Sequence, residues 1–201
     1  ETALKINSES AIIHNNYAAL LLERFNDLKG AEKHFKLALK INSDNFLLHF
    51  NYANFLHTKL NDWVGAKEYF EKALRINPNE TISYRNYAFL LELAFDDIEG
   101  AKALYEKALQ IDPNDYCSHD NYAVLLSHKF DDIEGAKDHY EKSLQINPNN
   151  NVAHYNYANL LAGKFYDSEK AKEHYEKALQ IDPNDAHVHY HYSLLLALEF
   201  N

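Results

Sequence analysis

The chain has 201 residues, of which 46% are hydrophobic and 25% charged, so it carries enough apolar material for a sizeable folded core. The net charge of −10 argues against nucleic acid or an anionic membrane surface as a partner, since both attract clustered Lys and Arg. The apolar runs are too short to span a bilayer, and the single cysteine, Cys117, excludes an internal disulfide framework and favours a reducing compartment such as the cytoplasm.

The chain begins with the end of a helix and then repeats itself. Residues 1–8 are predicted to be the tail of a preceding repeat, because Ala3–Ser8 resembles Ala38–Ser43. The triplet Asn-Tyr-Ala recurs every 35 residues, beginning at Asn16, Asn51, Asn86, Asn121 and Asn156. The predicted repeats cover residues 9–43, 44–78, 79–113, 114–148 and 149–183, and residues 184–201 are the first helix of a sixth. The absence of Met indicates a piece of a longer protein or a processed form.

Each repeat is predicted to form two helices. In the fourth repeat one stripe has the i, i+3, i+4, i+7 spacing of a buried helix face and consists of His119, Tyr122, Ala123 and Leu126. Asp132 is the predicted N-cap of the second helix, and Asn147-Pro148 ends it. Neither helix can bury its stripe alone, so neighbouring repeats must stack. The prediction is an all-α fold, an α-solenoid of about 11 helices in antiparallel pairs plus an N-terminal helix stub.

The repeat resembles the tetratricopeptide repeat, whose pattern is W-x2-L-G-x2-Y followed by Ala, Phe and Pro. In the fifth repeat these places are held by His154, Tyr157, Ala158, Leu161, Ala171, Tyr175 and Pro183. The first helix departs from the family in all four places, and the repeat is one residue longer, with the extra residue expected in the turn around Phe165. The resemblance implies a right-handed superhelix and a role in binding proteins.

One column of histidines lies on the predicted buried stripe and consists of His14, His49, His119, His154 and His189. We expect a core role with hydrogen-bonded ring nitrogens, and a pH effect stays open. We do not expect a metal ladder, because stacked helices lie about 8–10 Å apart, too far for equivalent imidazoles to share an ion. His187 and His191 have the spacing of a metal pair, but the sequence offers no further ligands, so we predict no metal and no cofactor.

The recurrent Asn of each triplet points away from the centre of the core stripe, and helix propensity does not favour it. Two interpretations stay open: a hydrogen bond between helices that sets the repeat spacing, or a ladder of amides that holds a peptide backbone. The column is similar to that of the tetratricopeptide domain of O-linked N-acetylglucosamine transferase, whose first helices read x-x-N-L-A and whose Asn residues hold peptide. The resemblance implies the same role for Asn16, Asn51, Asn86, Asn121 and Asn156.

Beside this column lie residues that vary between repeats, as a recognition groove requires. The candidate peptide-binding residues are Phe50, Asn54, Arg85, Phe89, Asp120, Tyr155 and Asn159. The carboxylate clamp that some family members use for Hsp70 or Hsp90 tails needs Lys-x-x-x-Asn and Lys-x-x-x-Arg on this face. Because Arg85 is the one basic residue there, the sequence argues against such a ligand.

The chain has no Gly-rich phosphate loop, nucleophile elbow or Cys-x-x-Cys, so we do not expect an enzyme. The leading hypothesis is a scaffold that binds a peptide or partner segment along its concave surface. The alternative is end-to-end assembly into a fibre or spacer through uncapped ends, at Leu4, Ile6, Tyr192, Leu195 and Leu196. RNA binding is a third class that the acidity disfavours.

Overall fold

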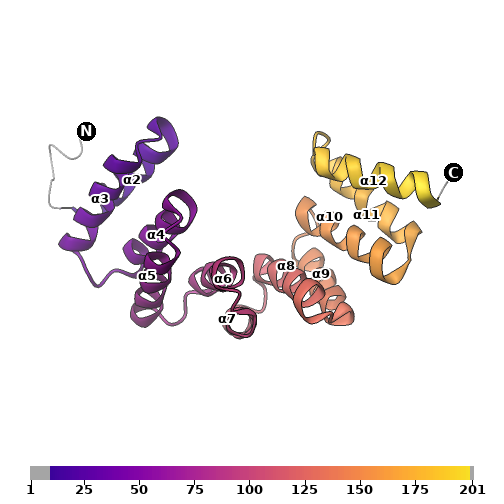
Figure 1. Cartoon of the computed structure of the whole chain (residues 1–201), viewed down its shortest axis with the longest axis horizontal. Coiled ribbons are helices and arrows are strands. Elements are labelled where there is room, and N and C mark those ends of the chain that lie inside the picture. The colour runs from indigo at the N-terminus through magenta and orange to yellow at the C-terminus, as the bar shows by residue number, and fades with distance from the viewer. Residues whose placement is uncertain (1–9, 200–201) are drawn as a thin grey trace. The chain divides into compact units, whose positions relative to one another are not determined.

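The computed structural model describes residues 10–199, and every regular element within that range is a helix. The first helices of the repeats are α2 (Ala11–Phe25), α4 (Phe46–Phe55), α6 (Thr81–Leu90), α8 (Tyr116–Leu125), α10 (Asn151–Leu160) and α12 (Ala186–Glu199). The second helices are α3 (Leu28–Ile41), α5 (Trp63–Ile76), α7 (Ile98–Ile111), α9 (Ile133–Ile146) and α11 (Ser168–Ile181). These eleven α-helices of the described range run in consecutive antiparallel pairs (Figure 1), which confirms the all-α solenoid. The predicted stub at residues 1–8 lies outside the described residues.

By its internal contacts the chain divides into two compact halves, Glu1–Leu104 and Tyr105–Asn201. In the first half α2 packs on α3 and α4 on α5, while α3 and α5 also contact α4 and α6, the first helices of the repeats that follow them. The second half is built in the same way, with α9 against α10 and α11 against α12. The second helices α3, α5, α9 and α11 are thus buried both by their own partner and by the first helix of the following repeat, as stacking requires.

Four of the first helices end in a π-helical turn. These turns are η1 (Leu56–Leu60), η2 (Leu91–Phe95), η3 (Leu126–Phe130) and η4 (Leu161–Phe165). A π turn takes up one extra residue within a helix, so the buried stripe before it keeps its register. The sequence predicted the extra residue of the fifth repeat around Phe165, and the structure has it in the last helical turn, which ends at that residue.

Small and aromatic side chains form alternate layers of the core. The alanine of each second helix is fully buried, at Ala31, Ala66, Ala101, Ala136 and Ala171. One turn further on, the aromatic residues are at most 4% exposed, at Phe35, Phe70, Tyr105, Tyr140 and Tyr175. The alanines allow close approach of the paired helices, and the aromatic rings fill the space between repeats.

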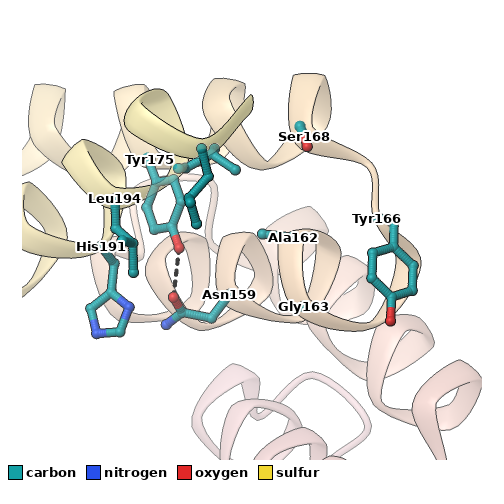
Figure 2. Close-up of a pocket in the computed structure, with 10 residues that line it drawn as sticks. Asn159, Ala162, Gly163, Tyr166, Ser168, Tyr175, His191 and Leu194 are labelled. Atoms are coloured by element: carbon teal, nitrogen blue, oxygen red, sulfur yellow. Dashed lines mark hydrogen bonds between the residues drawn. The ribbon is translucent and has the colours of Figure 1, made fainter. Parts of the chain in front are cut away.

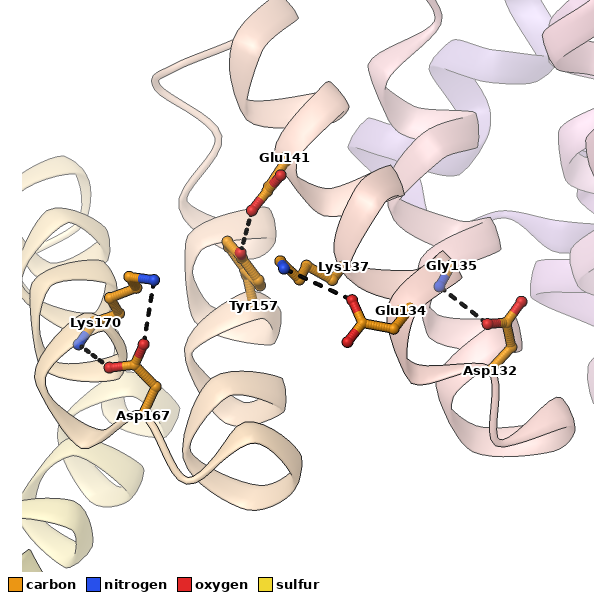
Figure 3. A network of polar contacts seen from close by, with 8 residues as sticks. All are labelled: Asp132, Glu134, Gly135, Lys137, Glu141, Tyr157, Asp167 and Lys170. Atoms are coloured by element: carbon orange, nitrogen blue, oxygen red, sulfur yellow. Dashed lines mark hydrogen bonds and ion pairs between the residues drawn. The ribbon is translucent and has the colours of Figure 1, made fainter.

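A hydrogen bond between successive repeats recurs at a constant place. The Tyr hydroxyl of a first helix donates to Oε1 of a Glu on the preceding second helix, in Tyr87–Glu71, Tyr122–Glu106, Tyr157–Glu141 and Tyr192–Glu176, at 2.7–2.9 Å. Burial and this bond raise the pKa of Tyr192 to about 12. Figure 3 shows one such bond beside two helix caps. The carboxylate of Asp132 accepts from the backbone N–H of Gly135 at 3.0 Å, which confirms the predicted N-cap.

A residue in the left-handed conformation follows the first helix in each of the first five repeats, at Asn26, Asn61, Asp96, Asp131 and Tyr166. The next residue donates its backbone N–H to a carbonyl six residues back, as in Asp167 to Leu161 at 3.1 Å. Asn and Asp tolerate this conformation, because their short polar side chains bond locally, whereas an aromatic residue is strained there. Tyr166 therefore destabilises the end of its own helix.

Replacing Tyr166 by Asn is expected to raise the free energy of unfolding by about 1 kcal/mol, because it relieves this backbone strain. Urea unfolding followed by circular dichroism measures the change. The reciprocal substitution Asn61→Tyr, at the equivalent place in the first half, is the matched control and should lower stability by a similar amount. Equal or lower stability of Tyr166→Asn would show that the Tyr side chain contributes more by its contacts than it costs in strain.

Candidate functional site

The asparagine column lies on the first helices, and its members differ between the two halves. In the first half, Nδ2 of Asn51 donates to Oδ1 of Asn15 at 3.1 Å, and Nδ2 of Asn86 donates to Oδ1 of Asn54 at 2.9 Å. Each of these bonds joins neighbouring first helices. Asn16 is exposed and accepts from Asn15 at 3.3 Å. In the first half the column therefore bridges successive helices, one of the two roles that the sequence left open.

In the second half the same column is open. The side chains of Asn121 and Asn156 are half-buried and form no hydrogen bond with another described residue. Asn156 lines a cavity of about 190 Å³ whose walls come from η3, α9, α10 and η4, which we call the polar cavity. Its walls are Ser127, His128, Tyr140, Asn156, Asn159, Leu160, Gly163 and Lys164. An amide without an internal partner beside a cavity is available to a ligand.

A second cavity, which we call the apolar cavity, has a volume of about 290 Å³ and lies one repeat further on (Figure 2). Its walls are Asn159, Ala162, Gly163, Tyr166, Ser168, Tyr175, His191, Leu194, Leu195 and Leu198. Seven of these residues stand 35 positions after a wall of the polar cavity, namely Ala162, Gly163, Tyr175, His191, Leu194, Leu195 and Leu198. The shared positions show that this kind of cavity recurs with the repeat.

The polar cavity presents mainly hydrogen-bond donors. Oδ1 of Asn159 accepts from the hydroxyl of Tyr175 at 2.6 Å (Figure 2), which leaves the NH2 group of that amide for another partner. The hydroxyl of Ser127 donates to the backbone carbonyl of Val124 at 3.0 Å. The ammonium group of Lys164 contacts Asp131 at 3.1 Å, in an ion pair whose two side chains are 49% and 80% exposed. Exposed pairs of this kind contribute little, so the ammonium group can take another partner.

The apolar cavity opens beside an exposed hydrophobic stripe. Leu194 and Leu198 stand one turn apart on α12 and are 46% and 71% exposed, and Tyr190 continues the stripe at 65%. The strained Tyr166 is 84% exposed at the rim of the same cavity. Isolated exposed apolar residues are ordinary, but several around one cavity indicate a binding surface.

The remaining variable residues have mixed surroundings. Phe50 is half-buried against the ring of Phe70, and Phe89 is 45% exposed with its ring 6.0 Å from that of His57. Tyr155 packs against the imidazole of His191, with their centroids 5.5 Å apart. Arg85 is half-buried. These side chains lie at the surface of the first helices, where a ligand can reach them.

Asp120 differs from the other variable residues because it is buried, with 7% of its surface exposed. Its carboxylate accepts a hydrogen bond from Nδ2 of Asn150, and the Ser143 hydroxyl lies nearby. Loss of water around the carboxylate raises its pKa to about 6, although Ser143 and Asn150 oppose this rise. Because Asp120 is buried and hydrogen-bonded inside the protein, we expect it to affect the free energy of unfolding.

The histidine column belongs to the core except at His189, and in most of its members Nε2 is held by a backbone carbonyl. His14, His49, His119 and His154 are 4–7% exposed, whereas His189 is exposed. Nε2 of His154 bonds to the carbonyl of Pro148 at 3.0 Å, and the same bond recurs at His49, His119 and His189. Since a carbonyl only accepts, the Nε2 atoms must donate, and Nδ1 is left with its lone pair.

The Nδ1 lone pair faces a second column of histidines, which lies on the second helices. The sequence analysis did not predict this second column. In three repeats Nδ1 of the first histidine lies 2.8 Å from Nδ1 of another on the second helix, in the pairs His14–His34, His119–His139 and His154–His174. Burial and then the neighbouring histidine lower the pKa of His139 and His174 to about 4. The recurrence of His34, His139 and His174 at multiples of 35 residues was the available signal.

The other candidates carry no separate chemistry. Cys117 is half-buried. Between residues 10 and 199 no three His, Cys, Asp or Glu side chains are grouped closely enough to hold a metal ion. Within the same range no helix has both the length and the apolar character needed to cross a membrane.

Comparison with known proteins agrees with the geometry. A family model of the tetratricopeptide repeat matches residues 49–80, 90–115, 120–150 and 153–185. No curated protein matches the sequence at a significant level. Similar solved structures include YrrB, described as a TPR protein with an unusual peptide-binding site, at 24% identity over 96% of both chains with a TM-score of 0.64.

Two further structures have higher TM-scores at lower identity. PilF of Pseudomonas aeruginosa is 21% identical over 94% of this chain and 88% of its own, with a TM-score of 0.78. Yeast Tom70 is 17% identical over 98% of this chain and 41% of its own, with a TM-score of 0.80. At these identities the likenesses establish the fold.

Proposed function

The chain belongs to the tetratricopeptide repeat family, and from this premise we propose that it is a scaffold that binds an extended peptide segment along its first helices. The observation that carries the proposal is the pair of repeat-related cavities, each lined by the residue at the asparagine column, Asn156 or its counterpart His191. The solved structure of YrrB, with its peptide-binding site, supports this kind of role in the fold.

The open amides of the second half supply the proposed contacts to the ligand. An Asn side chain offers two donors and one acceptor at once, which matches the carbonyl and N–H of an extended backbone. Asn121 and Asn156 are 35 residues apart, on successive first helices, so they would hold points of the peptide one repeat apart. The Tyr–Glu bonds between repeats keep the helices in place, which lowers the entropy cost of binding.

The proposed partner is a protein or peptide. The net charge of −10 disfavours nucleic acid and anionic lipid. Arg85 alone on the variable face does not make a carboxylate clamp, so we do not propose an Hsp70 or Hsp90 tail. We propose a binding role for the described residues and assign them no catalytic one.

Selection from a random peptide library tests the proposal. The double variant Asn121→Ala/Asn156→Ala is expected to weaken binding of the selected peptides about 25-fold, since each lost hydrogen bond is worth about 1 kcal/mol. The matched control is Gln110→Ala/Gln145→Ala, which removes two exposed amides from second helices and should leave affinity unchanged. Equal affinity of all three proteins for the selected peptides would contradict the proposal.

End-to-end assembly has less support among the residues that the sequence suggested for it. Leu195 was expected to face outward but is 7% exposed, because it packs inside the apolar cavity wall. The hydroxyl of Tyr192 donates to Glu176, and its ring stacks on Tyr175 at 5.7 Å. Leu196 is half-buried, and Leu4 and Ile6 lie outside the described residues. We therefore do not propose assembly as the function.

A further inference from the structure

We propose that the second half recognises a peptide with an apolar side chain and a carboxylate side chain separated by two residues. This inference rests on the proposed function and names the ligand chemistry of the same site. The apolar side chain enters the apolar cavity, and the carboxylate enters the polar cavity.

The spacing follows from the repeat. The two cavities share Asn159 and Gly163 as a common wall, so they are neighbours on one surface. Successive packed helices lie about 8–10 Å apart. A polyproline II segment rises about 3.1 Å per residue and has three residues per turn, so side chains at i and i+3 point the same way about 9 Å apart. A ligand in that conformation places its first and fourth side chains in adjacent cavities.

The apolar cavity suits one aliphatic or aromatic side chain. Its volume of about 290 Å³ is at the lower end of the range for small-molecule pockets, and its mouth is formed by Leu194, Leu198 and Tyr166. The other repeats have Asn or Asp at the place of Tyr166, where those residues cost less backbone strain. An aromatic residue kept at a strained, 84% exposed position beside a cavity fits a role in contacting a ligand.

The polar cavity suits a carboxylate. Lys164, the free NH2 of Asn159 and the amide of Asn156 converge on it, together with the imidazole of His128. No Asp or Glu is among its walls, and Asp131 contacts Lys164 from outside in an exposed ion pair. A carboxylate accepts from several donors at once, and charge-assisted bonds are about twice as strong as neutral ones.

The acidity of the whole protein does not outweigh these local donors. At physiological ionic strength charges are screened over about 8 Å, so most of the net charge of −10 acts weakly on a group inside the cavity. Donors within hydrogen-bonding distance of the ligand therefore decide the preference. Long-range repulsion should slow association at low salt, and added salt should relieve it.

The test uses fluorescently labelled peptides with the core Leu-Pro-Pro-Glu, in which the prolines impose the required conformation. Fluorescence anisotropy compares this peptide with Leu-Pro-Pro-Gln, Ala-Pro-Pro-Glu and the reversed order Glu-Pro-Pro-Leu. We expect each replacement to weaken binding at least fivefold. Lys164→Ala should weaken binding of the Glu peptide and leave binding of the Gln peptide unchanged. Leu198→Ser should weaken binding of the Leu peptide and leave binding of the Ala peptide unchanged.

The protein variants keep the inference separate from a folding effect and from the proposed function. Tyr166→Asn is expected to bind the Leu peptide more weakly while unfolding at higher urea, which loss of folding cannot produce. Equal binding of the Glu and Gln peptides, or of the Leu and Ala peptides, would overturn the inference. If library-selected peptides without the motif still depend on Asn121 and Asn156, the proposed function stands and the inference fails. If the protein binds no peptide and instead forms a dimer that Leu198→Ser abolishes, both the proposed function and the inference are overturned.

Discussion

The free energy of unfolding of the parent protein is expected to fall between pH 7 and pH 4.5. In the double variant His139→Tyr/His174→Tyr this fall is expected to be roughly 3 kcal/mol smaller. Burial lowers the pKa of both imidazoles to about 4, below their value in the unfolded chain. The neutral histidines contribute their full stabilisation when the pH is above their unfolded-state pKa of 6.5. This stabilisation is lost as the pH falls toward their folded-state pKa of about 4. Tyrosine does not titrate in this range, and Tyr69 already occupies the equivalent place beside His49, with ring centroids 5.7 Å apart.

The charges around each pair modify this effect without reversing it. Asp138, Asp132 and Glu106 favour protonation of His139, whereas His119 opposes it. His174 faces His154, Lys177 and Lys170, all of which oppose its protonation. Urea unfolding at both pH values, with His187→Tyr as an exposed control on α12, measures the difference. Equal acid sensitivity of the double variant and the parent would show that the pairs do not control stability.

Replacing Asp120 by Asn is expected to stabilise the protein by roughly 2 kcal/mol at pH 7.5 and to have little effect at pH 4. Burial raises the pKa of this carboxyl from 3.8 to about 6, so its charged form is unfavourable in the folded state. The penalty is present above the folded pKa and disappears as the pH falls below the unfolded value. An amide has the same shape and no charge, and it can bond to Ser143 and Asn150.

Chemical unfolding at the two pH values separates this account from a simple packing effect. Asp138→Asn, on the exposed surface of α9, is the matched control and should change stability by less than about 0.5 kcal/mol. A lower free energy of unfolding for Asp120→Asn at pH 7.5 would mean that the carboxylate is needed in its charged form. That result would point to a partner for Asp120 other than Asn150 and Ser143.

The periodicity of the sequence was sufficient to predict the helix pairs and the buried histidine column, because both follow from one residue type at one repeat position. It did not predict the His119–His139 type of pair, since the two rings come from different helices and only packing brings them together. The inward packing of Leu195 was missed for a similar reason: helix periodicity gives a face but not the neighbour that covers it.

The asparagine column shows a limit of reasoning from repeats. The triplet is the same in all five copies, yet Asn51 and Asn86 bond to neighbouring helices while Asn121 and Asn156 remain open. The difference comes from the variable residues beside them, because Asn15 and Asn54 supply the acceptors in the first half. The cavities also depend on Lys164 and Leu198, which the sequence analysis did not single out.

NMR titration of the isotope-labelled chain with a library-selected peptide tests whether an extended peptide binds on the first helices. We expect the largest backbone shift changes on α8, α10, η4 and α12, around Asn121, Asn156, Asn159 and Leu194. Shift changes confined to the exposed faces of α9 and α11, with those four positions unchanged, would contradict it.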